Sequence, residues 1–330
     1  MRTTITIYMY NRIWSCFPPD SGFSSRSYTV NTACRVNIQA YEVTRKKSLF
    51  LHTNIISMAK TVIITGASQG IGKATALLFA RKGYNIVLAA RQADRLEVAA
   101  KEVRELGTEA LAVSCDVRDS VQVNNLVQKA IARFGCVDVL INNAGIFCLG
   151  PVEEFSLSEW QQVIDTNLWG YIHTIEAILP HFLERGTGTI VNLSSIGGIV
   201  PIPYQIPYTT SKYAVTGLTK ALQAELSPQG IQVCGVYPNF IRTQILERTI
   251  FRGKNEQTTR DRHALVDKAI NTPILDLPED VASSIWHAIE HQQTDAIVGT
   301  AKLSKAAYKF FPGLMQSLFR RLFGMKERRY

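Results

Sequence analysis

The sequence lacks several features that would narrow its function at once. Its six cysteines are Cys16, Cys34, Cys115, Cys136, Cys148 and Cys234. None belongs to a C-x-x-C pair, so we expect small buried thiols in a reducing compartment and no metal site. No apolar run reaches the roughly 18 residues of a membrane-spanning helix. A soluble, cytoplasmic protein is therefore expected.

The central part of the chain also lacks the positive charge of a nucleic-acid-binding protein. The chain carries a formal net charge of +9, with +5 on residues 1–57, +7 on residues 302–330 and −3 on residues 58–301. Basic residues thus gather at the two ends. Because nucleic-acid binding needs a basic patch on the folded surface, no nucleic-acid partner is expected.

Residues 1–57 lack both a sustained hydrophobic period and the apolar core of a secretory signal. Their acid-poor composition, with Arg and Ser, is also found in organelle transit peptides. The alternative is that translation starts at Met58, directly before the first predicted strand. We favour the later start, because the tract has no clear amphipathic helix. Residues 1–57 are then a disordered or non-native extension of a domain spanning 58–301.

The first strong motif is a glycine turn between a strand-like and a helix-like segment. Residues 61–65 are β-branched, and residues 73–80 have a helical pattern. Unpaired amides at the helix N-terminus, the helix dipole and the close approach that glycine allows make such a turn a pyrophosphate site. The G-x-x-x-G-x-G spacing departs from the usual G-x-G-x-x-G, and an ordinary turn is the alternative. The predicted cofactor-binding residues are Gly66, Ser68, Gly70, Ile71 and Gly72.

Strand-like and helix-like segments then alternate along the chain, which is the pattern of a parallel sheet with helices on both faces. The further predicted strands are residues 85–90, 110–115, 137–141, 189–195, 231–237 and 296–299. Helices are predicted between them, the longest at 206–226. We therefore predict a single α/β domain with a doubly wound, Rossmann-type parallel sheet.

The residue after the second strand indicates which dinucleotide is bound. In this kind of fold an acidic residue there binds the 2′-hydroxyl of NAD, whereas an arginine accommodates the 2′-phosphate of NADP. Here Ala90 is followed by Arg91. Because a guanidinium pairs well with a phosphate, NADP(H) is the predicted cofactor. The alternative is that Arg91 only lies on a surface loop.

Three motifs together resemble the short-chain dehydrogenase/reductase family, in its classical branch. They are TGASQGIG at 65–72, Asp116-Val117 after the third strand and NNAG at 142–145. The resemblance implies that Asp116, Val117 and Asn143 contact the cofactor. It also implies an enzyme that interconverts a carbonyl and a secondary alcohol by hydride transfer.

The next motifs place a phenol and an amine on one face of a helix. Tyr208 and Lys212 are four residues apart, so an ammonium there would lower the phenol pKa from about 10 towards the working range. Such a pair alone is common on solvated helices. The resemblance implies Tyr208 as the acid/base and Ser195 as the group that orients the substrate. It further implies that Lys212 activates the phenol, that Asn167 supports proton relay, and that Tyr208 and Lys212 contact the cofactor.

Residues 238–243 resemble the family's P-G-x-x-x-T turn, with Asn239 in place of the glycine. Asparagine tolerates left-handed backbone angles, so the turn is expected to form. The resemblance then implies that Ile241 and Thr243 contact the cofactor, with Thr243 on the nicotinamide carboxamide. Residues 244–277 are polar and irregular in pattern. They are a substrate lid by resemblance, and a plain surface excursion is the alternative.

Residues 302–330 form a basic amphipathic tail, with aromatic and basic side chains interleaved over 303–323. One interpretation is a segment packed over the pocket or against a second subunit. The other is peripheral membrane contact. The resemblance also implies a homo-oligomer that pairs through the helices near 166–184 and 206–226.

The substrate is expected to be a small apolar carbonyl compound or alcohol. The residues predicted to line its pocket are Phe147, Ile196, Tyr204 and Phe240. Three rival functions are an NADPH-binding redox sensor without turnover, a membrane-recruited scaffold and a nucleotide-sugar epimerase. The complete Ser-Tyr-Lys-Asn set disfavours the sensor, and residues 244–330 are short for the substrate domain of an epimerase.

Overall fold

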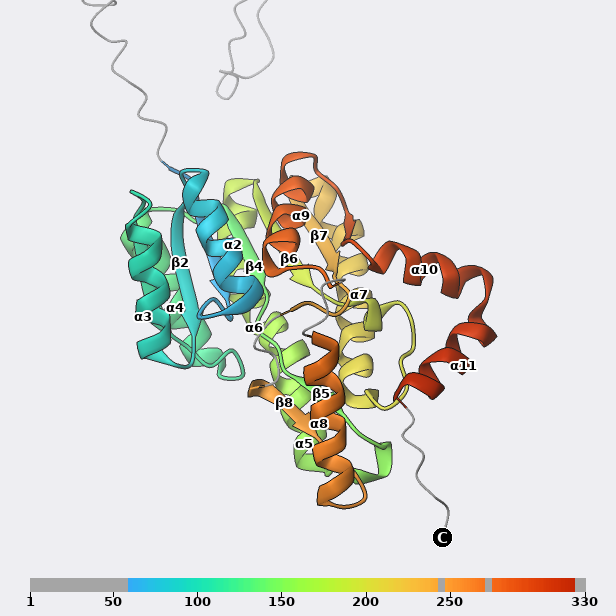
Figure 1. Ribbon diagram of the computed structural model, residues 1–330. Coiled ribbons are helices and arrows are strands. Elements are labelled where there is room, and N and C mark those ends of the chain that lie inside the picture. Colours follow the sequence, from blue (N-terminus) through green and yellow to red (C-terminus); the bar gives the residue numbers. More distant parts are fainter. Residues whose placement is uncertain (1–58, 243–246, 271–274, 324–330) are drawn as a thin grey trace, which may run out of the picture. The chain divides into compact units, whose positions relative to one another are not determined.

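A seven-stranded parallel β-sheet forms the centre of the domain (Figure 1). The computed structural model describes residues 59–242, 247–270 and 275–323, all within one compact unit. The strand order is β3-β2-β1-β4-β6-β7-β9. The strands are β1 (Thr61–Thr65), β2 (Asn85–Ala90), β3 (Ala110–Ser114), β4 (Val139–Asn142), β6 (Gly188–Leu193), β7 (Ile231–Tyr237) and β9 (Asp295–Ile297). This order confirms the predicted doubly wound, Rossmann-type fold.

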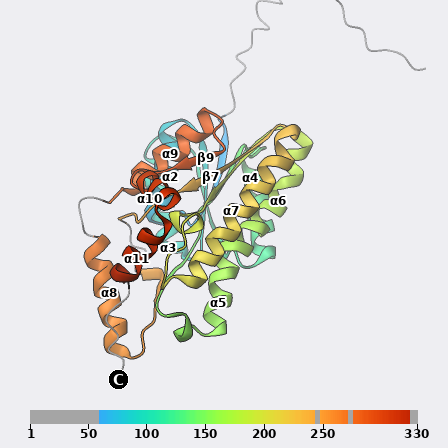
Figure 2. The same cartoon turned by 90° about the vertical axis from the view of Figure 1, so that its right-hand side faces the viewer.

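Helices cover both faces of the sheet, because its strands are apolar on both sides. One layer consists of α2 (Gly70–Arg81), α3 (Ala93–Arg104) and α9 (Pro278–Glu290), and the other of α4 (Ser120–Phe134), α6 (Gly170–Arg185) and α7 (Ile206–Leu226). Figure 2 shows the sheet between these layers. Within β1, Ile64 packs in the core under the first layer and Ile63 in the core under the second. Alternate residues of one strand thus contribute to two separate cores.

A second, two-stranded parallel sheet pairs β5 (Phe147–Leu149) with β8 (Thr249–Phe251), and α8 (Glu256–Ile270) follows β8. The prediction that residues 244–277 are irregular is therefore wrong for those that the structure describes. The sequence of α8 has few apolar positions, but its Val266 is only 4% exposed. Tertiary packing, rather than a strong hydrophobic period of its own, holds this helix.

A π-helical turn lies within a long helical segment that leads towards the site. Ser156 and Glu159 form a capping box at the start of α5 (Leu157–Ile164). The π-helical turn (Asp165–Trp169) follows without a break and continues into α6. The helix predicted from residue 165 therefore begins earlier than expected. Such turns are rare and occur frequently at functional sites.

Two short helices, α10 (Ala301–Phe310) and α11 (Pro312–Phe323), end the described part of the chain. Tyr308 and Phe319 pack against an apolar cluster that includes Ile196. Among the described residues, no helix has the length and apolar character needed to cross a membrane. In that same part of the chain no group of three or more His, Cys, Asp or Glu side chains could hold a metal ion.

Candidate active site

The glycine turn between β1 and α2 is shaped by backbone contacts that leave no room for side chains. Gly66 and Gly70 have positive φ angles of 65° and 56°, a region that favours glycine. A Cβ on Gly72 would lie 2.4 Å from the carbonyl oxygen of Gly66. The side chain of Gln69 does not cap α2. The first amides of α2 are therefore presented without a side-chain cap, as an anion site requires.

The ends of β1 and β4 are tied together beside this turn. Thr65 Oγ1 accepts hydrogen bonds from the backbone N–H groups of Asn143 (2.9 Å) and Ala144 (3.0 Å). Asn143 Nδ2 donates to the carbonyls of Thr65 (2.8 Å) and Gly66 (3.2 Å). The side chain of Asn143 thus stabilises the conformation of the glycine turn. The part played by Thr65 was not predicted, because its sequence neighbourhood shows only a strand end.

Two adjoining clefts open at this edge of the sheet. With the open solvent at their mouths included, the Tyr208 cleft encloses about 1120 Å³ and the Arg91 cleft about 750 Å³. Four residues line both clefts, namely Gly66, Gly145, Ile146 and Arg248. The glycine turn therefore lies where the two clefts meet. An elongated ligand can occupy both clefts at once.

Three arginines gather around the Arg91 cleft, namely Arg91, Arg95 and Arg248. Arg248 Nη2 donates to Ser68 Oγ at 3.3 Å, and Arg95 pairs with Glu247 at 2.6 Å. Burial lowers the pKa of Arg248, and the charge of Arg91 lowers it further. This excess of positive charge suits a phosphate group. Sequence reasoning found Arg91 and Ser68 but missed Arg95 and Arg248, because Arg248 comes from the segment after β7.

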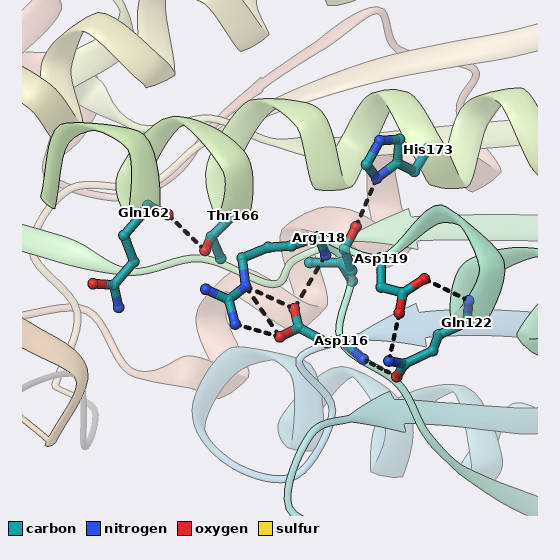
Figure 3. A network of polar contacts seen from close by, with 8 residues as sticks. Asp116, Arg118, Asp119, Gln122, Gln162, Thr166 and His173 are labelled. Carbon is teal, nitrogen blue, oxygen red and sulfur yellow. Dashed lines mark hydrogen bonds and ion pairs between the residues drawn. The ribbon is translucent and has the colours of Figure 1, made fainter. Parts of the chain in front are cut away.

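Asp116 and Val117 also line the Arg91 cleft. Arg118 donates to the Asp116 carboxylate through Nε and Nη2, with 2.6 Å between Nη2 and Oδ2 (Figure 3). Burial acts to raise the pKa of Asp116, but the hydrogen bonds and charge of Arg118 outweigh it and lower that pKa. The Val117 carbonyl lies 3.0 Å from Nδ1 of His173. The protein itself therefore keeps this carboxylate ionised and in place.

The structure brings Ser195, Tyr208 and Lys212 together in the Tyr208 cleft. Ser195 follows β6, where its Oγ accepts a hydrogen bond from the Gly197 N–H at 3.1 Å, and it lines the same cleft as Tyr208 in the first turn of α7. Lys212, one turn further along α7, donates from Nζ to the Leu193 carbonyl at 2.7 Å. Its Nζ lies 5.8 Å from the centroid of the Tyr208 ring. Ser195 and Lys212 are buried, and Tyr208 is partly buried.

Asn167 lies behind the wall of this cleft, in the π-helical turn. Its Nδ2 donates to the Ile146 carbonyl and to Ser211 Oγ, both at 3.0 Å, and its Oδ1 accepts from the Ile146 N–H at 2.9 Å. A Cβ on Gly145 would lie 3.3 Å from Asn167 Oδ1 and 3.8 Å from Lys212 Nζ. The side-chain amide of Asn167 therefore joins the segment after β4 to α7.

The expectation that the ammonium of Lys212 lowers the phenol pKa is wrong for the protein alone. Burial raises the pKa of Tyr208 to about 12, although the Ser195 hydroxyl acts to lower it. Burial also lowers the pKa of Lys212 to about 7. The amine therefore loses much of the charge that would have favoured the phenolate, because desolvation disfavours the charged form of both groups.

The turn after β7 differs from the expected geometry. Asn239 does not use the left-handed conformation, and its Nδ2 donates to Thr300 Oγ1 at 3.1 Å. Ile241 is buried and lines the Tyr208 cleft. The backbone N–H of Arg242 donates to the Asp276 carbonyl at 3.2 Å. Thr243, the last residue predicted to bind the cofactor, lies outside the described residues.

Phe147, Ile196 and Phe240 line the Tyr208 cleft as predicted. Tyr204 does not line this cleft, although it packs in the same cluster as Phe147 and adopts a positive φ of 63°. Sequence reasoning missed Gln205, which lines the cleft and is only 1% exposed. Its neighbourhood carries no signal beyond its position three residues before Tyr208.

Comparison with known sequences agrees with this geometry. The family model for short chain dehydrogenase matches residues 60–251. An uncharacterised oxidoreductase of Listeria monocytogenes is 38% identical over 234 residues, which are 67% of this chain and 92% of the relative. A 3-oxoacyl-acyl-carrier-protein reductase of Staphylococcus aureus is 35% identical over 206 residues, which are 62% of this chain and 84% of the relative.

Solved structures share the architecture. A short-chain dehydrogenase/reductase from Burkholderia phymatum in complex with NAD superimposes with a TM-score of 0.71 at 28% identity, covering 76% of this chain and 93% of that one. An actinorhodin polyketide ketoreductase variant with NADPH gives 0.65 at 32% identity, covering 72% and 95%. The chain, with its glycine turn beside a Ser-Tyr-Lys cleft, belongs to the short-chain dehydrogenase/reductase family of oxidoreductases.

Proposed function

We propose that the protein is an NADP(H)-dependent oxidoreductase that interconverts a carbonyl compound and a secondary alcohol, with Tyr208 as the acid/base. The observation that carries this proposal is that Ser195, Tyr208 and Lys212 line one cleft that reaches the glycine turn. A phenol and a hydroxyl side by side can both donate to one carbonyl oxygen. A redox sensor without turnover has no use for such a pair.

The Arg91 cleft and the glycine turn fit the proposed cofactor. Gly66 and Gly72 leave a cradle that a Cβ would fill, so a pyrophosphate can approach the backbone and the first amides of α2. Arg91, Arg95 and Arg248 supply the positive charge that favours a 2′-phosphate over a bare hydroxyl. The cofactor, when bound, supplies the hydride chemistry.

Tyr208 supplies the proton in the proposed reduction. Because burial raises its pKa to about 12, the phenol is protonated at neutral pH and ready to donate. Ser195 orients the substrate carbonyl, and the phenol proton moves to the oxygen as negative charge develops there. Lys212 in its protonated form stabilises the phenolate that remains. Asn167 holds Ile146 and Ser211, and thereby the floor of the cleft, in position.

The substrate that fits best is a ketone or secondary alcohol on an apolar skeleton. Aromatic and aliphatic side chains dominate the Tyr208 cleft, among them Phe147, Ile196 and Phe240. Relatives named as a 3-oxoacyl reductase and a polyketide ketoreductase support a ketone carried on a chain. Val266 of α8 also lines the cleft, which supports a lid role for the described residues after β8.

We also propose that the protein is a homo-oligomer located in the cytoplasm. Trp169, Leu183 and Tyr213, on or beside α6 and α7, are 40–46% exposed, which supports a second copy docking along these helices. Cys115 and Cys148 are free and buried, and free thiols persist in a reducing compartment such as the cytoplasm.

The deciding experiment compares wild type with Tyr208→Phe. The substitution removes one hydroxyl and keeps the ring that packs on Phe147 at 4.9 Å. We expect NADPH-dependent reduction of ketones to fall by roughly 10²–10⁴-fold. Quenching of protein fluorescence by NADPH should be unchanged. Equal turnover in both proteins, or NADPH binding without turnover of any carbonyl in the wild type, would overturn the proposal.

A further inference from the structure

Helices α10 and α11 form a hairpin (Figure 1, red). This hairpin exposes several large apolar side chains. The most exposed are Leu303 (75%), Phe310 (69%), Leu314 (68%), Phe311 (62%) and Leu318 (45%). Phe310 and Phe311 lie together where α10 ends. Leu314 and Leu318 are one helical turn apart on α11, so they share a face. Such a patch on a folded surface marks an interaction site.

The same hairpin is purely basic over its described length. Residues 301–323 contain no acidic residue. Their five cations are Lys302, Lys305, Lys309, Arg320 and Arg321. The three lysines of α10 are spaced by three and four residues, so they form one stripe along the helix. A second copy docking this face on its own counterpart would bring like charges together, whereas an anionic surface would complement them.

The hairpin also borders the Tyr208 cleft. Tyr308 of α10 and Phe319 of α11 pack on the cluster formed by Ile196, Val200 and Ile202. Ile196 and Ile202 themselves line the Tyr208 cleft. A surface that docks on the hairpin therefore lies beside the substrate cleft.

We propose that the α10–α11 hairpin docks the protein on a bilayer that contains anionic lipid. Phe310, Phe311 and Leu314 enter the interface between headgroups and acyl chains, and the lysine stripe binds the anionic headgroups. In a second step, which rests on the proposed function, the substrate is an apolar carbonyl compound that partitions into the same bilayer and enters the cleft from it.

The test is flotation of the full chain with vesicles of phosphatidylcholine alone or mixed with phosphatidylglycerol. Wild type should float only with the mixed vesicles. A Lys302→Gln, Lys305→Gln, Lys309→Gln triple variant should lose roughly a hundredfold in affinity, because each cation contributes about fivefold. Phe310→Ser with Phe311→Ser should lose at least about tenfold.

The matched control is Val121→Ser with Leu157→Ser, which removes two side chains that are 75% and 87% exposed elsewhere. This control should float like wild type. Absence of wild-type flotation, or an equal loss in the control, would overturn the proposal. Concentration-dependent self-association that the phenylalanine substitutions abolish would assign the face to a second copy instead. Reduction of a water-soluble ketone without vesicles should be unchanged in every variant. This assay therefore tests the proposed enzymatic function independently of membrane binding.

A second, independent observation concerns Gln205 at the start of α7. Its side chain is only 1% exposed and lines the Tyr208 cleft, and its Nε2 has no hydrogen-bond partner among the described residues. Buried donors without a partner are rare and costly. Gln205 precedes Tyr208 by three residues, so the amide and the phenol start from neighbouring positions on the helix.

We infer that Gln205 binds a second acceptor oxygen on the substrate, close to the carbonyl that is reduced. This inference rests on the proposed function and names a 1,3-dicarbonyl skeleton as the substrate class. Gln205→Met keeps the length of the side chain and removes its donors. The ratio of kcat/KM for a 1,3-diketone to that for a simple ketone of the same length should fall about tenfold, through KM.

The melting temperature of Gln205→Met should not fall, since no protein partner of its Nε2 is lost. Equal losses with both ketones, or no preference in the wild type, would overturn this inference. Calorimetric binding of the diketone to the Tyr208→Phe variant keeps the test independent of turnover. The heat of binding should weaken when Gln205→Met is added.

Discussion

The two clefts share four lining residues but are built in different ways. Much of the Arg91 cleft comes from the turns that follow β1, β2 and β3, where each turn is a short continuous segment. The Tyr208 cleft instead collects residues from β5, α7 and α8. Its flanking sheet pairs residues 147–149 with residues 249–251. A local motif can shape the first cleft, whereas the second forms only when distant segments have packed.

The difference extends to the chemistry of the two clefts. The Arg91 cleft presents backbone amides and charged side chains to a ligand. The pKa of Asp116 is lowered there by the hydrogen bonds and charge of Arg118. In the Tyr208 cleft, burial sets the pKa of Tyr208 and Lys212. Function in the second cleft therefore depends on desolvation, which costs stability.

Lys212→Met tests that cost and should have the largest effect on activity. We expect ketone reduction to fall by at least about a hundredfold, while the free energy of unfolding is unchanged or higher, since an apolar side chain replaces a buried amine. NADPH oxidation and urea unfolding measure the two. Lys220→Met, on the exposed face of the same helix near Asp295, is the control and should change neither by much. A large loss of stability in Lys212→Met would contradict this account of burial.

The pH dependence of stability sharpens the same point. Burial lowers the pKa of Lys212 from 10.5 to about 7, so between these values the unfolded chain binds more protons than the folded protein. The free energy of unfolding of the wild type should therefore gain from this group as pH rises from about 7 to 10.5. Lys212→Met should lack that gain. Parallel curves for the two proteins would show that the amine is not desolvated.

Gly72→Ala is the corresponding break in the glycine turn, where the two clefts meet. The new Cβ would meet the Gly66 carbonyl oxygen at 2.4 Å, so we expect a loss of about 1–3 kcal/mol in the free energy of unfolding together with weaker NADPH binding. The control is Gly217→Ala in α7, where a Cβ meets nothing within 4 Å. That change should stabilise the protein by about 0.5–1 kcal/mol. Similar effects of both substitutions would refute the steric argument.

Arg91→Ala and Arg248→Ala test the choice of cofactor. Each should raise the KM for NADPH by about tenfold and leave the KM for NADH almost unchanged, because a charged hydrogen bond to the 2′-phosphate is lost. Arg133→Ala, on the exposed part of α4, serves as the comparison. An equal rise for both cofactors would place these side chains on the pyrophosphate instead.

Val266→Ala should give the smallest change and probes the distant wall of the Tyr208 cleft. The side chain is 4% exposed and lines the cleft from α8. We expect the KM for an apolar ketone to rise by roughly three- to tenfold and the KM for NADPH to stay the same. Its neighbour Leu265, which is 36% exposed, provides the matched control Leu265→Ala. A rise in the KM for NADPH would mean that the clefts are not separable.

The sequence predicted the locally formed parts of both clefts better than the parts that distant segments bring to them. Gly66, Gly70 and Gly72 lie in one short turn, and Asn143 lies in a recognisable motif. Their roles could therefore be predicted from the spacing of neighbouring residues. Arg248 was missed because only the pairing of β8 with β5 brings its segment to the cleft. Gln205 was missed because an unpaired buried amide has no signature in the sequence.

The sequence by itself determined the seven strands of the central sheet and the positions of the glycine turn and of the Tyr208–Lys212 pair. β-branched runs, glycines and four-residue spacing act through local geometry, which needs no distant partner. Only the tertiary structure decided the pKa values of Tyr208 and Lys212, the arrival of Arg248 at the Arg91 cleft and the helical form of α8. These depend on burial and on contacts between segments far apart in the chain, and such collective quantities cannot be read from any one stretch of residues.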